Sequence, residues 1–192
     1  MTATQTKECE DLFSKVYYSY KTPVRVDNSF IPASSWGARR FQSIGIAAVP
    51  FLVRKSETST VGPQPRHKVN SRLIAIHMLT YALASNTGWE TTTVSAFKDA
   101  SIARECIPVF LRSLLDSDAG VRDFALGSLK DPFSRIADTK VLIIKYAEAM
   151  LNDKSVFVQT AGVRLLDRIG ERKRIPKELY QKFKPEESHW SY

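Results

Sequence analysis

The chain has 192 residues, of which 43% are apolar and 25% charged, a composition that excludes wholesale disorder and suits one soluble domain. Its net charge is +8, and its two cysteines and three scattered histidines argue against a disulfide framework and a zinc site. No apolar run reaches the roughly 18 residues of a membrane span, and the N-terminus lacks a secretory pattern, so a cytoplasmic protein is expected.

The first part of the chain is predicted to be a lead-in to the main domain. Apolar residues four apart predict a helix within Glu8–Tyr20, and a segment rich in proline and serine then predicts a loop or short extended arm. The only strand-like pattern is Val24–Val26. We therefore expect a lead-in over residues 1–37, one domain over 38–184 and a polar tail over 185–192.

From residue 39 onward the apolar residues recur at helical spacing, and short polar turns separate the runs. The first run contains Pro50, and after a long polar loop Val69–Ala84 is apolar on nearly every side, as in a helix buried between neighbours. Further helices are predicted within 93–115, 121–130, 141–151, 156–170 and 177–183. No pattern predicts a sheet, so the chain is expected to be all-α.

One segment, 107–129, is organised as two helices around a tight turn. Its first half carries an apolar stripe that ends at Leu114 and Leu115, and Asp116 and Asp118 then offer carboxylates that can cap a following helix. A second apolar stripe follows at i, i+4 and i+8, formed by Val121, Ala125 and Leu129. The two helices are expected to be antiparallel, with these stripes facing each other.

This unit resembles a HEAT repeat, in which a proline, a Leu-Leu pair, an acidic turn, Val-Arg, a small residue and a leucine follow in order. The matching residues are Pro108, Leu114, Leu115, Asp116, Asp118, Val121, Arg122, Ala125 and Leu129. A degenerate copy lies earlier in the chain, where Val49, Pro50, Arg72, Ala75 and Leu79 take the corresponding places. The resemblance implies a short right-handed α-solenoid of HEAT-like antiparallel helix pairs, with a generic helical bundle as the alternative.

Another copy of the unit begins about 36 residues after the first, and two registers fit it. One places Val158, Gly162 and Leu166 in the apolar stripe and needs an extra turn residue, whereas the other uses Ala161 and Leu165. The sequence alone does not decide between these two registers. Gln159 stands where the family has an arginine, which puts a ladder of Asp–Arg pairs between repeats in doubt.

The sequence contains no motif of a catalytic or phosphate-binding site: GxSxG, GxxxxGK[ST], GxGxxG and HExxH are all missing. His77 and Cys106 lie in apolar helical runs and are interpreted as packed side chains, and the acidic residues near Asp116 are interpreted as helix caps. We therefore predict no enzymatic activity, no catalytic residue, no cofactor and no bound metal.

The positive charge is concentrated in two blocks on either side of a mildly acidic middle. Residues 39–72 carry a net charge of +6 and residues 164–184 carry +5, whereas residues 89–139 carry −2. Such blocks favour acidic partners. The leading hypothesis is a protein-binding adaptor or inhibitor whose partner has an acidic surface, and the alternative is a nucleic-acid-binding HEAT-like protein.

The HEAT resemblance implies that a partner lies along the second helix of each pair, so arginines on those helices are the candidate binding residues. The candidates on these helices are Arg72, Arg122, Arg164 and Arg168, and Arg172 in the basic segment that follows them is a further candidate. For Arg122, pairing with the acidic turn of a neighbouring repeat is the competing interpretation. The segment 171–184 is interpreted as a capping helix that covers the end of the repeats with Ile175, Leu179 and Phe183.

A minor variant of the nucleic-acid alternative is a resemblance to the alkylpurine DNA glycosylases, which are built from HEAT-like repeats and hold damaged DNA with tryptophans, an Asp and an Arg. The tryptophans of this chain are Trp36, Trp89 and Trp190, and Thr93 stands where an Asp would be needed after Trp89. The resemblance therefore assigns no catalytic residue.

Overall fold

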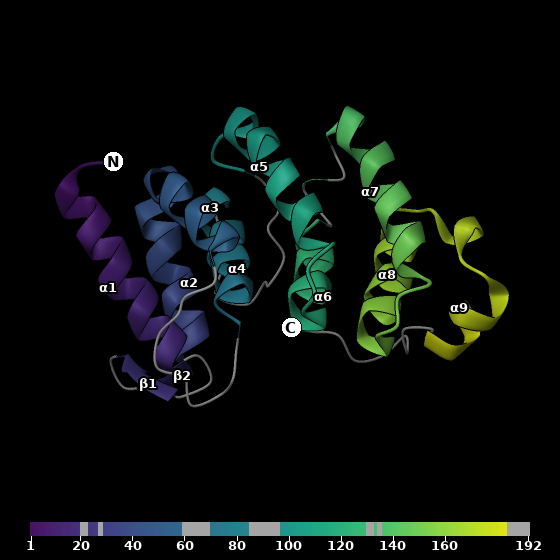
Figure 1. Cartoon of the computed structure of the whole chain (residues 1–192), viewed down its shortest axis with the longest axis horizontal. Coiled ribbons are helices and arrows are strands. Elements are labelled where there is room, and N and C mark those ends of the chain that lie inside the picture. Colours follow the sequence, from purple (N-terminus) through teal and green to yellow (C-terminus); the bar gives the residue numbers. More distant parts are fainter. Residues whose placement is uncertain are drawn as a thin grey trace. The chain divides into compact units, whose positions relative to one another are not determined.

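A computed structural model describes residues 1–19, 23–26, 29–58, 70–84, 97–129, 133 and 136–183 of the chain. The chain forms two compact units, Met1–Ala84 and Ser85–Tyr192. Apart from one short hairpin, the regular structure in the described ranges is helical (Figure 1). The all-α prediction is confirmed, and each unit is described by itself below.

The first unit contains four α-helices, a 3₁₀ turn and a hairpin among its described residues. The elements are α1 (Ala3–Ser19), β1 (Pro23–Val26), β2 (Ser29–Pro32), α2 (Ala33–Ile44), η1 (Gly45–Ala48), α3 (Val49–Glu57) and α4 (Ser71–Leu83). The two strands pair antiparallel, with Val26 opposite Ser29. The strand-like pattern at Val24–Val26 is thus one arm of a hairpin.

Helix α1 is part of the first unit's core, although the sequence predicted residues 1–37 as a lead-in. It packs against α2 and α4, and its apolar side chains Leu12, Phe13 and Val16 are buried. An edge-to-face contact joins the rings of Phe13 and Phe51, with centroids 5.9 Å apart. Burial of these side chains supplies a hydrophobic reason for α1 to fold onto the unit rather than extend from it.

Two local features explain how the helices of the first unit begin. Pro50 lies in the first turn of α3 rather than inside a helix, because the first turn is where a missing backbone N–H costs least. Helix α4 is capped by Asn70, whose side-chain oxygen accepts a hydrogen bond from the Arg72 backbone N–H at 2.9 Å. As predicted from its apolar character, most of α4 is buried, Ile74 and Leu79 completely.

The second unit is a succession of antiparallel helix pairs. Its elements are α5 (Ala100–Ser113), α6 (Ala119–Ser128), α7 (Ala137–Met150), α8 (Val156–Arg168), η3 (Arg172–Arg174) and α9 (Lys177–Phe183). Helix α5 pairs with α6, α7 pairs with α8, and α6 packs on α8 (Figure 1). Asp118 caps α6 as predicted, since its carboxylate accepts hydrogen bonds from the Gly120 and Val121 N–H groups at 2.7 and 3.3 Å.

The hydrogen bonds of the two turns set the repeat length at 37 residues. Asp116 Oδ1 accepts from the Asp118 N–H at 2.9 Å, and 37 positions later Asp153 Oδ1 accepts from the Ser155 N–H at 2.8 Å. The C-caps of α5 and α7, Leu114 and Leu151, have the same separation. The two turns therefore have equal length, and no extra residue is needed.

This register places Val158, Gly162 and Leu166 in the buried stripe of α8. Leu165 is also buried, which explains why the pattern of apolar residues in the sequence fitted both registers. The decisive position is Gly162, where an added Cβ would lie 3.2 Å from the Ala147 carbonyl oxygen of α7. A small residue is needed at this crossing, and the partly exposed Ala161 does not occupy it.

Candidate functional site

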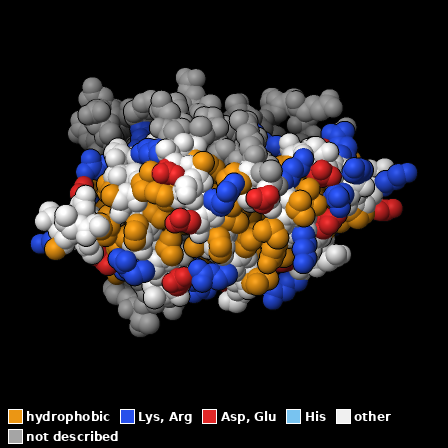
Figure 2. Space-filling view, turned by 90° about the horizontal axis from the view of Figure 1, so that it is seen from above, with side chains coloured by type: hydrophobic (Ala, Val, Ile, Leu, Met, Phe, Trp, Pro, Cys, Tyr) orange, Lys and Arg blue, Asp and Glu red, His pale blue; other side chains and the backbone are white. Residues whose placement is uncertain are grey.

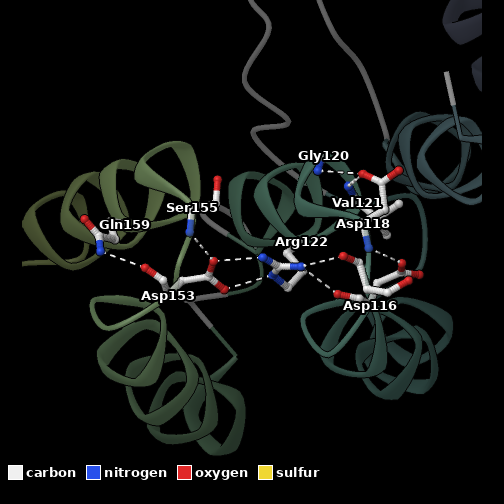
Figure 3. Close-up of polar contacts among 9 residues, drawn as sticks. Asp116, Asp118, Gly120, Val121, Arg122, Asp153, Ser155 and Gln159 are labelled. Atoms are coloured by element: carbon white, nitrogen blue, oxygen red, sulfur yellow. Dashed lines mark hydrogen bonds and ion pairs between the residues drawn. The ribbon is translucent and has the colours of Figure 1, made fainter. Parts of the chain in front are cut away.

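The turns of the second unit are joined by a buried arginine (Figure 3). Arg122 Nε and Nη2 donate to Asp153 Oδ2 and Oδ1 at 2.9 and 2.8 Å. The same guanidinium donates through Nη1 to the Asp116 and Ser117 carbonyl oxygens at 2.8 and 3.1 Å. The side chains of Arg122 and Asp153 are only 6% and 9% exposed. The hydrogen bonds from Arg122 lower the pKa of the Asp153 carboxyl below its ordinary value.

These contacts correct the prediction that Arg122 binds a partner. Its guanidinium is buried between the turn of its own repeat and Asp153 of the next repeat, so it is not presented to another molecule. A rung of an Asp–Arg ladder is therefore present. Gln159 occupies the position of Arg122 in the next repeat. Its Nε2 donates to the Asp153 carbonyl oxygen at 2.7 Å, just as Arg122 Nη1 donates to the Asp116 carbonyl oxygen. An amide replaces the guanidinium at the edge of the second repeat.

The other predicted arginines belong to different units, Arg72 to the first and Arg164, Arg168 and Arg172 to the second. Arg164 and Arg168 are exposed on one face of α8, one helical turn apart. Arg172 is held in place, since its Nε donates to Asp167 Oδ1 at 2.6 Å and its guanidinium lies 4.7 Å from the Tyr180 ring centroid. Arg72 is half-buried in the first unit, at the start of α4. Within the second unit, Arg164 and Arg168 are exposed neighbours on one helix.

The face that carries these two arginines also contains a residue that the sequence did not single out. Phe157, in the first turn of α8, is 77% exposed, and it stands three and four positions before Thr160 and Ala161 on the stripe that leads to Arg164. Its counterpart in the preceding repeat is Gly120. The 37-residue register would have revealed Phe157, because it places this ring beside the buried Val158 and outside the core stripe.

Helix α6 contributes the neighbouring part of this face. The positions that correspond to Phe157, Thr160, Ala161 and Arg164 are Gly120, Asp123, Phe124 and Gly127, and none of them is fully buried. We call these residues and Arg168 the α6–α8 face. Partial burial raises the pKa of the Asp123 carboxyl, while the nearby Arg164 charge lowers it. A Cβ built at Gly127 meets no heavy atom within 4 Å, so the face is open at that point.

The basic C-terminal segment packs on α8 and is anchored by ion pairs. Arg174 donates to Glu148 Oε1 at 2.9 Å and to Glu171 Oε2 at 3.0 Å. Ile175 is 6% exposed, and both η3 and α9 contact α8. This arrangement fits the capping interpretation, in which charges remain in water while apolar side chains cover the last helix pair.

The titratable side chains of Cys106, which is buried, and of His77, which is half-buried by surface exposure, were interpreted from the sequence as packed groups. Burial raises the pKa of the Cys106 thiol to about 11, with the Glu105 charge adding to the effect. The thiol is therefore protonated at neutral pH, the unreactive form. His77 lies on α4 with its ring centroid 5.4 Å from that of Tyr81. Burial lowers the pKa of His77 to about 4.

Acidification is expected to destabilise the protein through His77. Because the folded pKa of His77 lies below its ordinary value, the unfolded chain binds the proton more tightly, and stability falls as the pH drops from about 6.5 towards about 4. Between pH 7 and pH 4.5 this group should account for about 2 kcal/mol of lost unfolding free energy. Urea unfolding at the two pH values tests this, with His77→Gln as the variant that should lose this part of the pH dependence. An equal pH dependence in both proteins would contradict it.

A shallow open pocket of about 380 Å³ lies in the first unit between α1 and α2. Its lining residues are Glu8, Asp11, Leu12, Lys15, Trp36 and Arg40. The Lys15 ammonium lies 4.9 Å from the Trp36 ring centroid, and Arg40 pairs with Glu8 at 3.5 Å. Trp36 is thus engaged by a cation of its own chain. Trp89, Thr93 and Trp190, the other residues weighed for a glycosylase-like site, lie outside the described residues.

Within the described residues, no group of three or more His, Cys, Asp or Glu side chains is arranged to hold a metal ion. None of the described helices combines the length and apolar character that a membrane crossing requires.

Comparison with known proteins finds a likeness in fold. No protein-family model and no curated protein sequence matches the chain. Among solved structures, the chain is similar to one described as the complex of CpcE and CpcF of phycocyanin lyase from Nostoc sp. PCC7120, with 14% sequence identity. The TM-score is 0.51, and the match covers 92% of this chain and 84% of the other. At this identity the likeness supports the helical-repeat fold, whereas membership of the HEAT family in particular stays a prediction.

The comparison also corrects the prediction of a non-enzymatic protein. That prediction rested on the missing catalytic motifs, yet a chain with a similar fold belongs to a lyase. The absence of familiar motifs is therefore no argument against activity in this architecture. The chain has a helical-repeat fold, and the solved structure with a similar fold comes from an enzyme complex.

Proposed function

We propose that this chain is a helical-repeat protein that binds another protein across the α6–α8 face. The observation that carries the proposal is Phe157, an aromatic ring 77% exposed on the same stripe of α8 as Arg164 and Arg168. Exposed aromatic residues next to arginines are typical of the centres of protein interfaces. The similar solved structure is itself described as a complex of two proteins, which supports a protein partner.

The chemistry of the face indicates what the partner presents. Phe157 and the half-buried Phe124 offer apolar surface at one end, and Arg164 and Arg168 offer two guanidinium groups towards the other. Arginine side chains bind carboxylates in a forked geometry. We therefore infer that the partner contributes a segment with an apolar side chain over Phe157 and acidic side chains near the two arginines. Such binding fits an adaptor or inhibitor role. Any enzymatic activity should be assayed on the complex of this chain with its partner.

The test compares two variants that differ in location and are matched in chemistry. Phe157→Ser combined with Arg164→Glu removes one exposed apolar group and reverses one charge on the α6–α8 face. Leu115→Ser combined with Arg104→Glu makes the same changes at exposed positions of α5 and its turn; Leu115 is 70% exposed. Tagged proteins are used to capture partners from nuclease-treated native lysate, and the affinity of each purified partner is then measured.

The α6–α8 variant should lose at least about 100-fold in affinity for a directly binding partner, because an interface centre has been removed, whereas the control should bind as the original chain does. Equal binding by all three proteins would refute this assignment of the face. Capture that disappears on nuclease treatment, with steeply salt-dependent binding to an arbitrary DNA duplex, would instead establish the nucleic-acid alternative.

A further inference from the structure

Helix α7 exposes an apolar pair on the side that does not pack against α8. Val141 is 70% exposed and Leu142 is 42% exposed. They lie within a stripe of exposed positions at i, i+3, i+4, i+7 and i+11, which share one side of a helix. The stripe consists of Asp138, Val141, Leu142, Lys145 and Ala149. Apolar side chains also reach the surface among charged ones on the face of the molecule shown in Figure 2.

The preceding repeat shows that packing does not require apolar residues at these positions. The residues 37 positions before Val141 and Leu142 are Arg104 and Glu105 on α5, and both are exposed. The repeat thus folds with charged side chains at this place. An adjacent Val and Leu left in water at the same place in α7 gain nothing until another surface covers them.

The charges of the stripe are arranged symmetrically about the apolar pair. Asp138 lies three positions before Val141, and Lys145 lies three positions after Leu142. In the part of the chain that the structure describes, neither Asp138 nor Lys145 forms an ion pair. A two-fold axis through the midpoint of Val141 and Leu142 would place each Asp138 opposite the Lys145 of a second, antiparallel helix.

We propose that a second copy of this chain docks on α7 through this stripe, with the two α7 helices antiparallel. The contact is isologous: Val141 and Leu142 of each copy meet at the axis, and two Asp138–Lys145 pairs flank them. A parallel arrangement in the same register would place Asp138 against Asp138 and Lys145 against Lys145, which like-charge repulsion disfavours. This surface is separate from the α6–α8 face, and the proposal does not depend on the proposed function.

The size of the stripe determines how strong the association is. A contact made by one exposed stripe on each helix belongs to the small class of protein interfaces, below about 1,200 Å² in total. Interfaces of this kind form weak or transient complexes, so we expect a dissociation constant on the order of 100 μM. The dimer should therefore be visible only in concentrated solution.

The experiment is sedimentation equilibrium of the full chain over a concentration range of roughly 10 μM to 1 mM. The original chain should pass from monomer to dimer within this range. Val141→Glu should remain monomeric, because it buries a charge at the axis. Leu115→Glu alters an equally exposed apolar residue elsewhere in the second unit and should dimerise as the original chain does.

Charge reversal tests the antiparallel geometry. Asp138→Lys and Lys145→Asp should each raise the dissociation constant by about tenfold, since each reversal creates two repulsive pairs. The double variant should return it to within about twofold of the original value, because the swapped charges are again complementary. Asp138 also lies in the first turn of α7, so circular dichroism is used to confirm that each variant is folded at the measuring temperature.

The proposal is overturned if the original chain stays monomeric up to about 1 mM, well above the expected dissociation constant. It is equally overturned if Val141→Glu dimerises normally, or if Leu115→Glu abolishes a dimer that Val141→Glu preserves. Failure of the double charge swap to restore association would rule out the antiparallel pairing of Asp138 with Lys145.

Discussion

Replacing Arg122 with alanine is expected to lower the unfolding free energy by about 3–5 kcal/mol, the largest effect we predict for a single side chain. The change leaves the Asp153 carboxylate, 9% exposed, without its forked partner. It also removes the donor to the Asp116 and Ser117 carbonyl oxygens. Breaking a buried ion pair is costly because the remaining charge stays desolvated, and two unpaired carbonyl groups add to this cost.

The effect is measured by urea unfolding of Arg122→Ala and of a matched surface variant. Arg174→Ala removes an arginine that also contacts two acidic residues, Glu148 and Glu171, but its side chain is 41% exposed. Water screens such surface pairs, so this variant should be far less destabilised. A similar loss in both variants would show that burial does not govern the Arg122 contact. Asp153→Ala should be less than additive with Arg122→Ala, because the two side chains form one unit.

The pH dependence of this contact follows from the pKa of Asp153. Its folded pKa is lowered by the hydrogen bonds from Arg122, so the stabilisation is present above the ordinary carboxyl pKa and is lost as the pH falls through the acid range below it. This range lies below the one in which His77 titrates, since the pKa of His77 is about 4 in the folded state and about 6.5 in the unfolded state. In Arg122→Ala, the unfolding free energy should therefore still fall in the pH range in which His77 titrates. It should lack the further fall at lower pH that comes from Asp153.

Replacing Gly37 with valine is expected to cost about 2–3 kcal/mol, because it overpacks the place where α1, α2 and α4 meet. A Cβ at this position would overlap Val16 Cγ2 and lie 3.2 Å from Val16 Cγ1 and 3.4 Å from Met78 Sδ. Val16 and Met78 are completely buried, and side-chain rotation cannot relieve the overlap because the backbone fixes the position of the Cβ. The short approach of α1 to α2 thus requires a glycine.

The control is a helical glycine with free space around it. Gly127 on α6 has no neighbour within 4 Å of a built Cβ, so Gly127→Ala should stabilise the protein by about 0.5–1 kcal/mol through helix propensity. Thermal unfolding should therefore move in opposite directions for Gly37→Val and Gly127→Ala. Val16→Ala should recover part of the loss caused by Gly37→Val, since it removes the overlapping methyl groups. Independent, additive effects of these two changes would argue against the contact.

Local periodicity accounted for most of the secondary structure. The spacing of apolar residues and the acidic turn after Leu115 predicted the α5–α6 pair, and the Asp118 cap formed as expected. The sequence pattern did not detect the packing role of α1, because residues 1–37 contain both a helix and many turn-forming residues. Whether such a segment extends from the domain or folds onto it depends on whether its apolar side matches the surfaces of α2 and α4, including the close contact of Val16 with Gly37.

The candidate site was only partly predictable. The spacing of Arg164 and Arg168 predicted that they share a helix face, and both are exposed, whereas their binding of a partner stays a prediction. Phe157 was not singled out, because an aromatic residue near a helix start is indistinguishable in the sequence from a core residue. The same limit applies to Arg122, which was a candidate for both a partner contact and a structural one. Its burial and its pairing with Asp153, 31 residues away, follow from the stacking of two helix pairs.

The amino-acid sequence by itself determined the all-α class, the turn at Asp116–Asp118 and the approximate repeat, because these depend on local propensities and on side-chain periodicity. The tertiary structure decided the 37-residue register, the burial of Arg122 and the exposure of Phe157 and Val141. Each of these depends on which helix faces meet. A periodic pattern specifies that a helix has an apolar side, but only packing between distant segments determines which of its remaining residues are covered and which stay available to other molecules.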